Sequence, residues 1–239
     1  MNKKLQLQES DQTIDLILNN DPENTMDMEV IQQLLLKLSD ITSDDQNKPI
    51  IIHSEGHNFS KGYDCSCLLV KDNEFLANVV SMGTAIAQLI HNYDRPVVAF
   101  AHGYAMGAGL ELLISCDYVI ADDSFKSGFP ETMFNFPNIM IPPEAMGKLI
   151  PRASLNSLAT GSSFNIEESL NLGIVNKRGT LKDAREIAIL MNNNFFSRSK
   201  QYYMLDQKEI KNYVQYIGSI DTHTLKLREL ENYRKTHFS

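Results

Sequence analysis

The sequence predicts an α/β fold built around a largely parallel sheet. Residues 49–53 form an apolar, β-branched run that suits a fully buried strand, and two more strand-like runs lie within residues 96–121. Helical signals separate these runs: residues 73–92 carry a broad apolar face, and a short glycine-punctuated helix precedes the last run. This order implies right-handed crossovers and parallel pairing. Loops at the carboxyl ends of such strands bind ligands, so we expect the functional site there.

Weaker signals extend the pattern toward both termini. Residues 5–8 and 14–18 are predicted to be short strands, and residues 26–38 an amphipathic helix. Residues 55–72 contain two glycines and no settled period, which indicates a loop with one helical turn at most. Further helices are predicted at 144–150, 155–160, 166–172 and 181–193, with one long amphipathic tail over about 199–235.

The change to helical periodicity near Pro142 predicts two domains. We expect a core at residues 1–141, which carries the site, and a helical region at residues 142–239, which packs on the core or on another subunit. Within the helical region, Thr180 with Asp183 forms a candidate capping box.

Composition and charge argue against several functional classes. The net charge is −8, so the chain has no positive field to attract nucleic acid or an anionic membrane. No run approaches the roughly 20 apolar residues of a membrane span, and the first ten residues lack the apolar core of a signal peptide. The three cysteines and the histidines have no metal-site spacing. We expect a cytoplasmic protein without a metal site.

One carboxylate lies in unusual surroundings. Glu111 sits in the sequence LELLISC, between Leu110 and Leu112. Isolated carboxylates are seldom left among apolar side chains unless they are paired or used in chemistry. Glu111 is therefore a candidate acid or base.

Three short motifs are candidates for the rest of a site. The glycines of residues 103–109 permit a tight turn into a helix whose first N–H groups can donate to an oxyanion, although a packed strand-to-helix turn explains them equally well. FSKGYD at 59–64 and FPE at 129–131 also have a simpler interpretation as solvated loops. The spacing G-x-G-x-x-G and a phosphate-binding G-x-x-x-x-G-K-[ST] are both absent, which argues against a nucleotide fold of either type.

Together, four segments resemble the enoyl-CoA hydratase/isomerase, or crotonase, superfamily. They are NDPENTM at 20–26, EGHNFSKGYD at 55–64, residues 96–121 and GFPE at 128–131, and the resemblance extends from about residue 13 to 190. It implies an α/β fold with a crotonase-like ββα spiral core and a helical C-terminal trimerisation region, assembled as a homotrimer or homohexamer. It also implies an acyl-CoA substrate and no tightly bound cofactor, with coenzyme A entering as part of the substrate.

The resemblance assigns roles to particular residues. The backbone N–H groups of Tyr63 and Ala108 would bind the thioester oxygen, where negative charge develops during reaction. Glu111 and Glu131 would be the two acids of a hydratase, while an isomerase would shuttle its proton on Glu131 alone. The predicted contacts to substrate or coenzyme A are Lys61, Gly62, Asp64 and Gly107.

Several positions depart from the family pattern. Asn135 stands where a glycine is expected after the second acid, and Ala108 replaces the middle glycine of the helix turn. Lys61 and Tyr63 replace small residues, which narrows the predicted acyl pocket and offers Lys61 to the phosphates of coenzyme A.

Because both acids are present, we predict hydration of a 2-enoyl-CoA. The alternatives are Δ3,Δ2-enoyl-CoA isomerisation through Glu131, decarboxylation or thioester hydrolysis, and a non-catalytic acyl-CoA binding protein that kept the fold. An acyl group on a carrier protein in place of coenzyme A is also open.

Overall fold

A six-stranded sheet forms the centre of the computed structural model, which describes residues 4–44, 47–64, 66, 73–194, 207–219 and 226–237. Its order is β1-β2-β3-β4-β6-β9; β1 is antiparallel to β2 and every other pair is parallel. The predicted parallel sheet is therefore confirmed. The strands are β1 (Leu5–Glu9), β2 (Ile14–Leu18), β3 (Ile50–Ser54), β4 (Val97–Ala101), β6 (Tyr118–Ala121) and β9 (Lys177–Arg178).

A second, three-stranded sheet is formed by segments that follow strands of the large sheet along the chain. It has the order β5-β7-β8, in which β5 is parallel to β7, and β7 is antiparallel to β8. Its strands are β5 (Tyr104–Met106), β7 (Lys126–Gly128) and β8 (Ser163–Asn165). Strand β5 corrects the sequence interpretation of residues 103–109 as a turn and helix start alone: three residues between glycines are too few to show a period.

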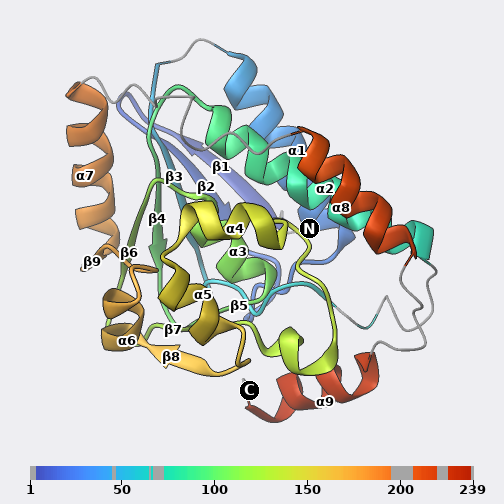
Figure 1. Cartoon of the computed structure of the whole chain (residues 1–239). Helices are drawn as coiled ribbons and strands as arrows, with labels where there is room; N and C mark the ends of the chain where they lie inside the picture. Colours follow the sequence, from blue (N-terminus) through green and yellow to red (C-terminus); the bar gives the residue numbers. More distant parts are fainter. Residues whose placement is uncertain are drawn as a thin grey trace.

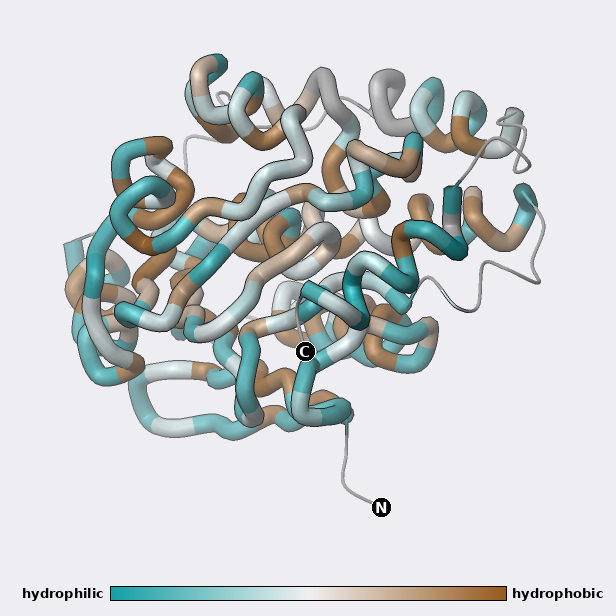
Figure 2. The backbone as a smooth tube through the Cα atoms, turned by 90° about the horizontal axis from the view of Figure 1, so that it is seen from below, coloured by the Kyte–Doolittle hydropathy of each residue, from teal (hydrophilic) through white to brown (hydrophobic). Residues whose placement is uncertain are grey.

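Helices cover both faces of the large sheet (Figure 1). On one face lie α1 (Met28–Ser43), α2 (Asn73–Asn92) and α3 (Ala108–Ser115), whose apolar side chains join the main core. On the other face α7 (Leu181–Asn193) packs Ala184 and Ala188 against a second cluster. The tube alternates between hydrophilic and hydrophobic residues along these helices (Figure 2), as amphipathic helices require.

Four short helical segments connect the core to α7. They are η2 (Pro130–Phe134), α4 (Pro143–Leu149), α5 (Arg152–Leu158) and α6 (Ile166–Asn171). The capping box of Thr180 and Asp183 is confirmed at the start of α7. The start of α1 is corrected: the helix begins at Met28, because Asp27 accepts the Val30 N–H and caps it.

The long amphipathic tail predicted over about 199–235 is helical in its described parts, but it forms more than one helix. The structure describes two helices there, α8 (Gln207–Ser219) and α9 (Leu227–His237), with 199–206 and 220–225 outside the described residues. They lie at different places, since α8 packs along α2 whereas α9 contacts η2 (Figure 1). The boundary at residues 141 and 142 stays a prediction. Among the described helices, none has the length and apolarity needed to cross a bilayer.

Candidate active site

The helix start after β5 presents the first candidate donor. Gly107 precedes α3 with φ +52° and ψ −122°, a conformation that glycine adopts readily. Ala108 is the first residue of the helix, so its N–H lacks an acceptor in a preceding turn. The turn therefore points a backbone donor out of the helix end.

Tyr63 lines the same cavity as this turn, and two main-chain hydrogen bonds to Met26 hold the residues on either side of it. The Met26 N–H donates to the Gly62 oxygen and the Asp64 N–H donates to the Met26 oxygen, both at 2.9 Å. In extended backbone the N–H and C=O of one residue point to the same edge, opposite to those of its neighbours. The N–H of Tyr63 therefore faces away from Met26, on the side where Arg234 donates to the Tyr63 carbonyl.

Glu111 is almost fully buried, and backbone donors surround its carboxylate. Ile139 N–H donates to Oε1 at 3.1 Å, while Met140 and Ile141 N–H groups donate to Oε2 at 2.8 and 2.7 Å. Burial raises the pKa of Glu111 to about 7, although these N–H groups and Asn138 act in the opposite direction. The carboxylate thus joins α3 to the segment that follows η2.

Glu131 lies in η2, immediately after a proline at the first helical position. Burial raises its pKa to about 8; a hydrogen bond from its own backbone and the charge of Arg234 lower the pKa, whereas repulsion from Glu111 raises it. Gly107 lies directly against this carboxylate, because a Cβ there would be 2.8 Å from Glu131 Oε1. The first helix turn and the second acid therefore face each other.

These groups enclose a cavity of about 10 Å³, which we call the inner cavity. That volume is about the least that holds one water molecule. Its lining consists of Tyr63, Gly107, Ala108, Glu111, Glu131, Phe136, Pro137, Ile139, Leu230 and Arg234. The inner cavity combines two acids, two candidate N–H donors and apolar walls.

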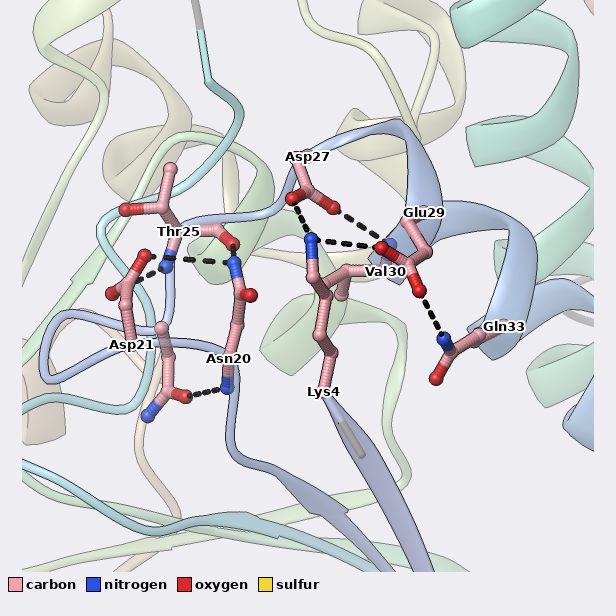
Figure 3. Close-up of polar contacts among 9 residues, drawn as sticks. Lys4, Asn20, Asp21, Thr25, Asp27, Glu29, Val30 and Gln33 are labelled. Atoms are coloured by element: carbon pink, nitrogen blue, oxygen red, sulfur yellow. Dashed lines mark hydrogen bonds and ion pairs between the residues drawn. The ribbon is translucent and has the colours of Figure 1, made fainter. Parts of the chain in front are cut away.

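A larger cavity of about 410 Å³, the outer cavity, adjoins the inner one through Tyr63 and Arg234. Lys61 lines it and pairs with Glu23 at 2.7 Å. Figure 3 shows how its wall is held: Lys4 reaches Asp27 and Glu29 at the start of α1. The complete lining is Asn20, Asp21, Glu23, Thr25, Asp27, Lys61, Tyr63, Asp64, Ser66, Glu231, Arg234 and Lys235.

The structure brings the predicted residues together at these two cavities. The acids Glu111 and Glu131 line the inner cavity with Tyr63, Gly107 and Ala108. Lys61 and Asp64 line the outer cavity, and Gly62 lies between the two, since its Cβ would be 3.2 Å from the Ala108 nitrogen. Asn135, the predicted departure from glycine, adopts φ +56°, a left-handed conformation that asparagine tolerates.

The sequence did not indicate the remaining residues that line the inner cavity. Phe136, Pro137 and Ile139 come from a segment without a period, and Leu230 and Arg234 lie about 100 residues beyond Glu131 on α9. The sequence pattern of Leu230 and Arg234, an apolar residue and a cation one helical turn apart, predicts a helix but does not show which part of the molecule that helix contacts.

Comparisons with known proteins agree with this fold and site. The model of the enoyl-CoA hydratase/isomerase family matches residues 9–229, so the chain belongs to this family. A probable enoyl-CoA hydratase of Bacillus subtilis is 31% identical over 166 residues, which cover 67% of this chain and 63% of that protein. The chain spans less than two thirds of the length of the first curated relatives it matches.

Solved structures extend the likeness over the whole chain. An enoyl-CoA hydratase from Thermoplasma volcanium has a TM-score of 0.73 at 25% identity, with 97% of each chain covered. A structure from Geobacillus kaustophilus has a TM-score of 0.77 at 20% identity, covering 100% of this chain and 96% of the other, and shows the fold alone. The fold is that of the crotonases.

Proposed function

We propose that this chain hydrates the double bond of a 2-enoyl thioester of coenzyme A. The observation that carries the proposal is the inner cavity, where two buried carboxylates meet two backbone donors. The N–H groups of Tyr63 and Ala108 bind the thioester oxygen, on which negative charge grows as water adds. Losing one such donor typically costs about 10²–10³ in rate.

The different surroundings of the two acids support separate roles. Three main-chain N–H groups favour the carboxylate form of Glu111, whereas the negative charge of Glu111 favours the protonated form of Glu131. Glu111 then takes a proton from water while the water oxygen bonds to the β-carbon of the substrate. Glu131 gives its own proton to the α-carbon. Transfer of a proton from Glu111 to Glu131 restores both groups. Acid and base pKa values near the working pH favour such catalysis.

Coenzyme A fits the proposal as the substrate's carrier, with its chain in the outer cavity and the acyl group beyond Tyr63. Lys61, Gly62 and Asp64 lie along this path, and Gly107 borders the acyl end. No tightly bound cofactor is required, because the residues of the inner cavity supply every proton. Assembly as a homotrimer or homohexamer belongs to the same proposal.

Double-bond isomerisation is the second candidate, and one observation favours it. Three backbone N–H groups already donate to the Glu111 carboxylate, which leaves few free lone pairs to accept a proton from water. Glu131 alone would then remove a proton from one carbon of a 3-enoyl thioester and return it two carbons away.

Absorbance of the conjugated enoyl thioester separates the candidates. Hydration of a short 2-enoyl-CoA lowers this absorbance, and Glu111→Gln should reduce the rate of that decrease about 10²–10⁴-fold. Isomerisation creates it from a 3-enoyl-CoA and should tolerate Glu111→Gln. Glu186→Gln, an exposed carboxylate of α7, is the charge-matched control. Calorimetric binding of acyl-CoA without turnover of either substrate would contradict both reactions and favour a non-catalytic binder.

A further inference from the structure

Helix α9 is fixed to η2, the short helix that bears Glu131. The Lys226 N–H just before the helix donates to the Phe134 oxygen at 3.1 Å, and the Tyr233 ring packs against the Phe134 ring with centroids 5.6 Å apart. Leu230 is buried and lines the inner cavity. This helix therefore places a defined face over the site.

Arg234 lies one turn beyond Leu230 on that face and lines both cavities. Its Nη1 donates to the carbonyl of Tyr63. Its Nη2 lies against Gly62, where a Cβ would be only 2.7 Å away. The guanidinium thus contacts the same short loop that supplies a proposed oxyanion donor.

Two charged side chains and one neutral wall face Glu131. Glu111 on α3 repels its negative charge, and Arg234 on α9 attracts it. The loop at Tyr63 contributes a neutral wall to the inner cavity, and the charged groups Lys61, Asp64, Glu231 and Lys235 lie in the outer cavity. Arg234 is the cation among the residues that line the inner cavity. Its removal therefore leaves Glu131 with Glu111 as its charged neighbour in that cavity.

We propose that Arg234 is a positioning residue for proton transfer, which orients Tyr63 through its carbonyl and keeps Glu131 able to ionise in a buried cavity. The role rests on the proposed function, because it acts through Glu131 and through the Tyr63 donor. It applies equally to hydration and isomerisation, since both exchange a proton with the substrate carbon next to the thioester or near it.

Exchange of the α-protons of butyryl-CoA with deuterated solvent, followed by NMR against pH, tests this role. The carboxylate form of Glu131 removes the proton, so the exchange rate rises with pH through its pKa. Loss of a nearby positive charge raises a carboxyl pKa by about 1 unit or more. In Arg234→Met the rise of the exchange rate with pH should therefore shift to a pH about 1 unit higher, and the rate at pH 7 should fall about tenfold.

Two variants separate this role from a structural one. Arg234→Lys retains the positive charge but not the planar guanidinium group. Its exchange rate should therefore rise at the same pH as in the wild type but reach a lower value. Arg228→Met removes an exposed charge from the same helix and should match the wild type. An unchanged pH dependence of the exchange rate in Arg234→Met, or an equal shift in Arg228→Met, would overturn the proposal. If the wild-type protein neither exchanges protons nor turns over enoyl thioesters, the proposed function itself fails.

Discussion

Buried carboxylates lie on both faces of the large sheet, but their partners differ. On the α7 face, Asp15 accepts hydrogen bonds from Thr13 at 3.1 Å and Arg185 at 2.6 Å, and His53 lies 3.3 Å away. Burial acts to raise the pKa of Asp15, but His53 and Arg185 outweigh it and the pKa is lowered. On the opposite face, burial dominates, and the pKa values of Glu111 and Glu131 are raised to about 7 and about 8.

The comparison shows that burial alone does not mark a working acid. Asp15 pairs with Arg185 of α7 and lies beside His53, an arrangement that attaches α7 to the sheet. At Glu111 burial outweighs the main-chain donors, and at Glu131 burial is reinforced by the negative charge of Glu111, so both pKa values are raised toward neutral pH. The kind of partner separates a structural carboxylate from a candidate catalytic one.

The largest effect is expected from Glu131→Gln. The amide cannot donate or accept the proton, so turnover of enoyl thioesters should fall by about 10²–10⁴. The folded state should persist, because the substitution removes a carboxyl group that is costly to ionise in the interior. Parallel assays of turnover and thermal unfolding would measure both; a variant with substantial activity would remove Glu131 from the reaction.

Gly107→Ala should also reduce activity, with less effect on binding. A Cβ would come within 2.8 Å of Glu131 Oε1 and the backbone has φ +52°, so the carboxylate must move. Misplacing a catalytic group by about 1 Å typically costs about 10²-fold in rate. Gly147→Ala is the matched control, because its Cβ would meet only Leu155 at 3.9 Å. Equal rates in the two variants would contradict the close contact.

Asp15→Asn should have the opposite outcome to Glu131→Gln. The substitution removes the negative charge of Asp15, with which Arg185 pairs and beside which His53 lies. We expect the free energy of unfolding to fall by about 1–3 kcal/mol. Turnover below the unfolding temperature should be unchanged, because Asp15 lies on the far face of the sheet. Urea denaturation with an activity assay tests this pair of expectations, and a loss of turnover would show that the two faces are coupled.

The last expected difference between the two faces concerns the pH dependence of stability. The folded-state pKa values of Glu111 and Glu131 exceed the ordinary value of 4.5, so the folded protein binds more protons. Their contribution to stability is fully present below pH 4.5 and is lost as the pH rises through about 7 and 8. The contribution of Asp15 has the opposite sign and is lost in acid. Denaturation between pH 5 and 9 should show a decline that Glu131→Gln reduces.

The sequence predicted those parts of the fold that repeat a pattern over many residues. The helices at Asn73–Asn92 and Leu181–Asn193 have clear periods, and both were placed correctly. Strand β5 has three residues and no period. The tail has one continuous amphipathic pattern, yet α8 and α9 pack against different partners, and local periodicity does not specify a partner.

The sequence predicted Glu111 through its side-chain chemistry and Tyr63, Ala108 and Glu131 through the family resemblance, but it did not predict the main-chain donors to Glu111. Glu111 was recognised because a charge among leucines is unusual. Its donors are the backbone N–H groups of residues 139–141, which every non-proline residue carries and which therefore leave no trace in the sequence. Arg234 reaches the site only through the packing of α9.

The three amides that meet Glu111 also provide a spectroscopic record of its ionisation. When the carboxylate takes up a proton, one of its oxygens becomes a donor, and these amides lose an anionic acceptor. The chemical shifts of residues 139–141 should then titrate together near pH 7. The amide resonances of three consecutive residues would then report the ionisation of Glu111, which lies 28 to 30 positions earlier in the chain.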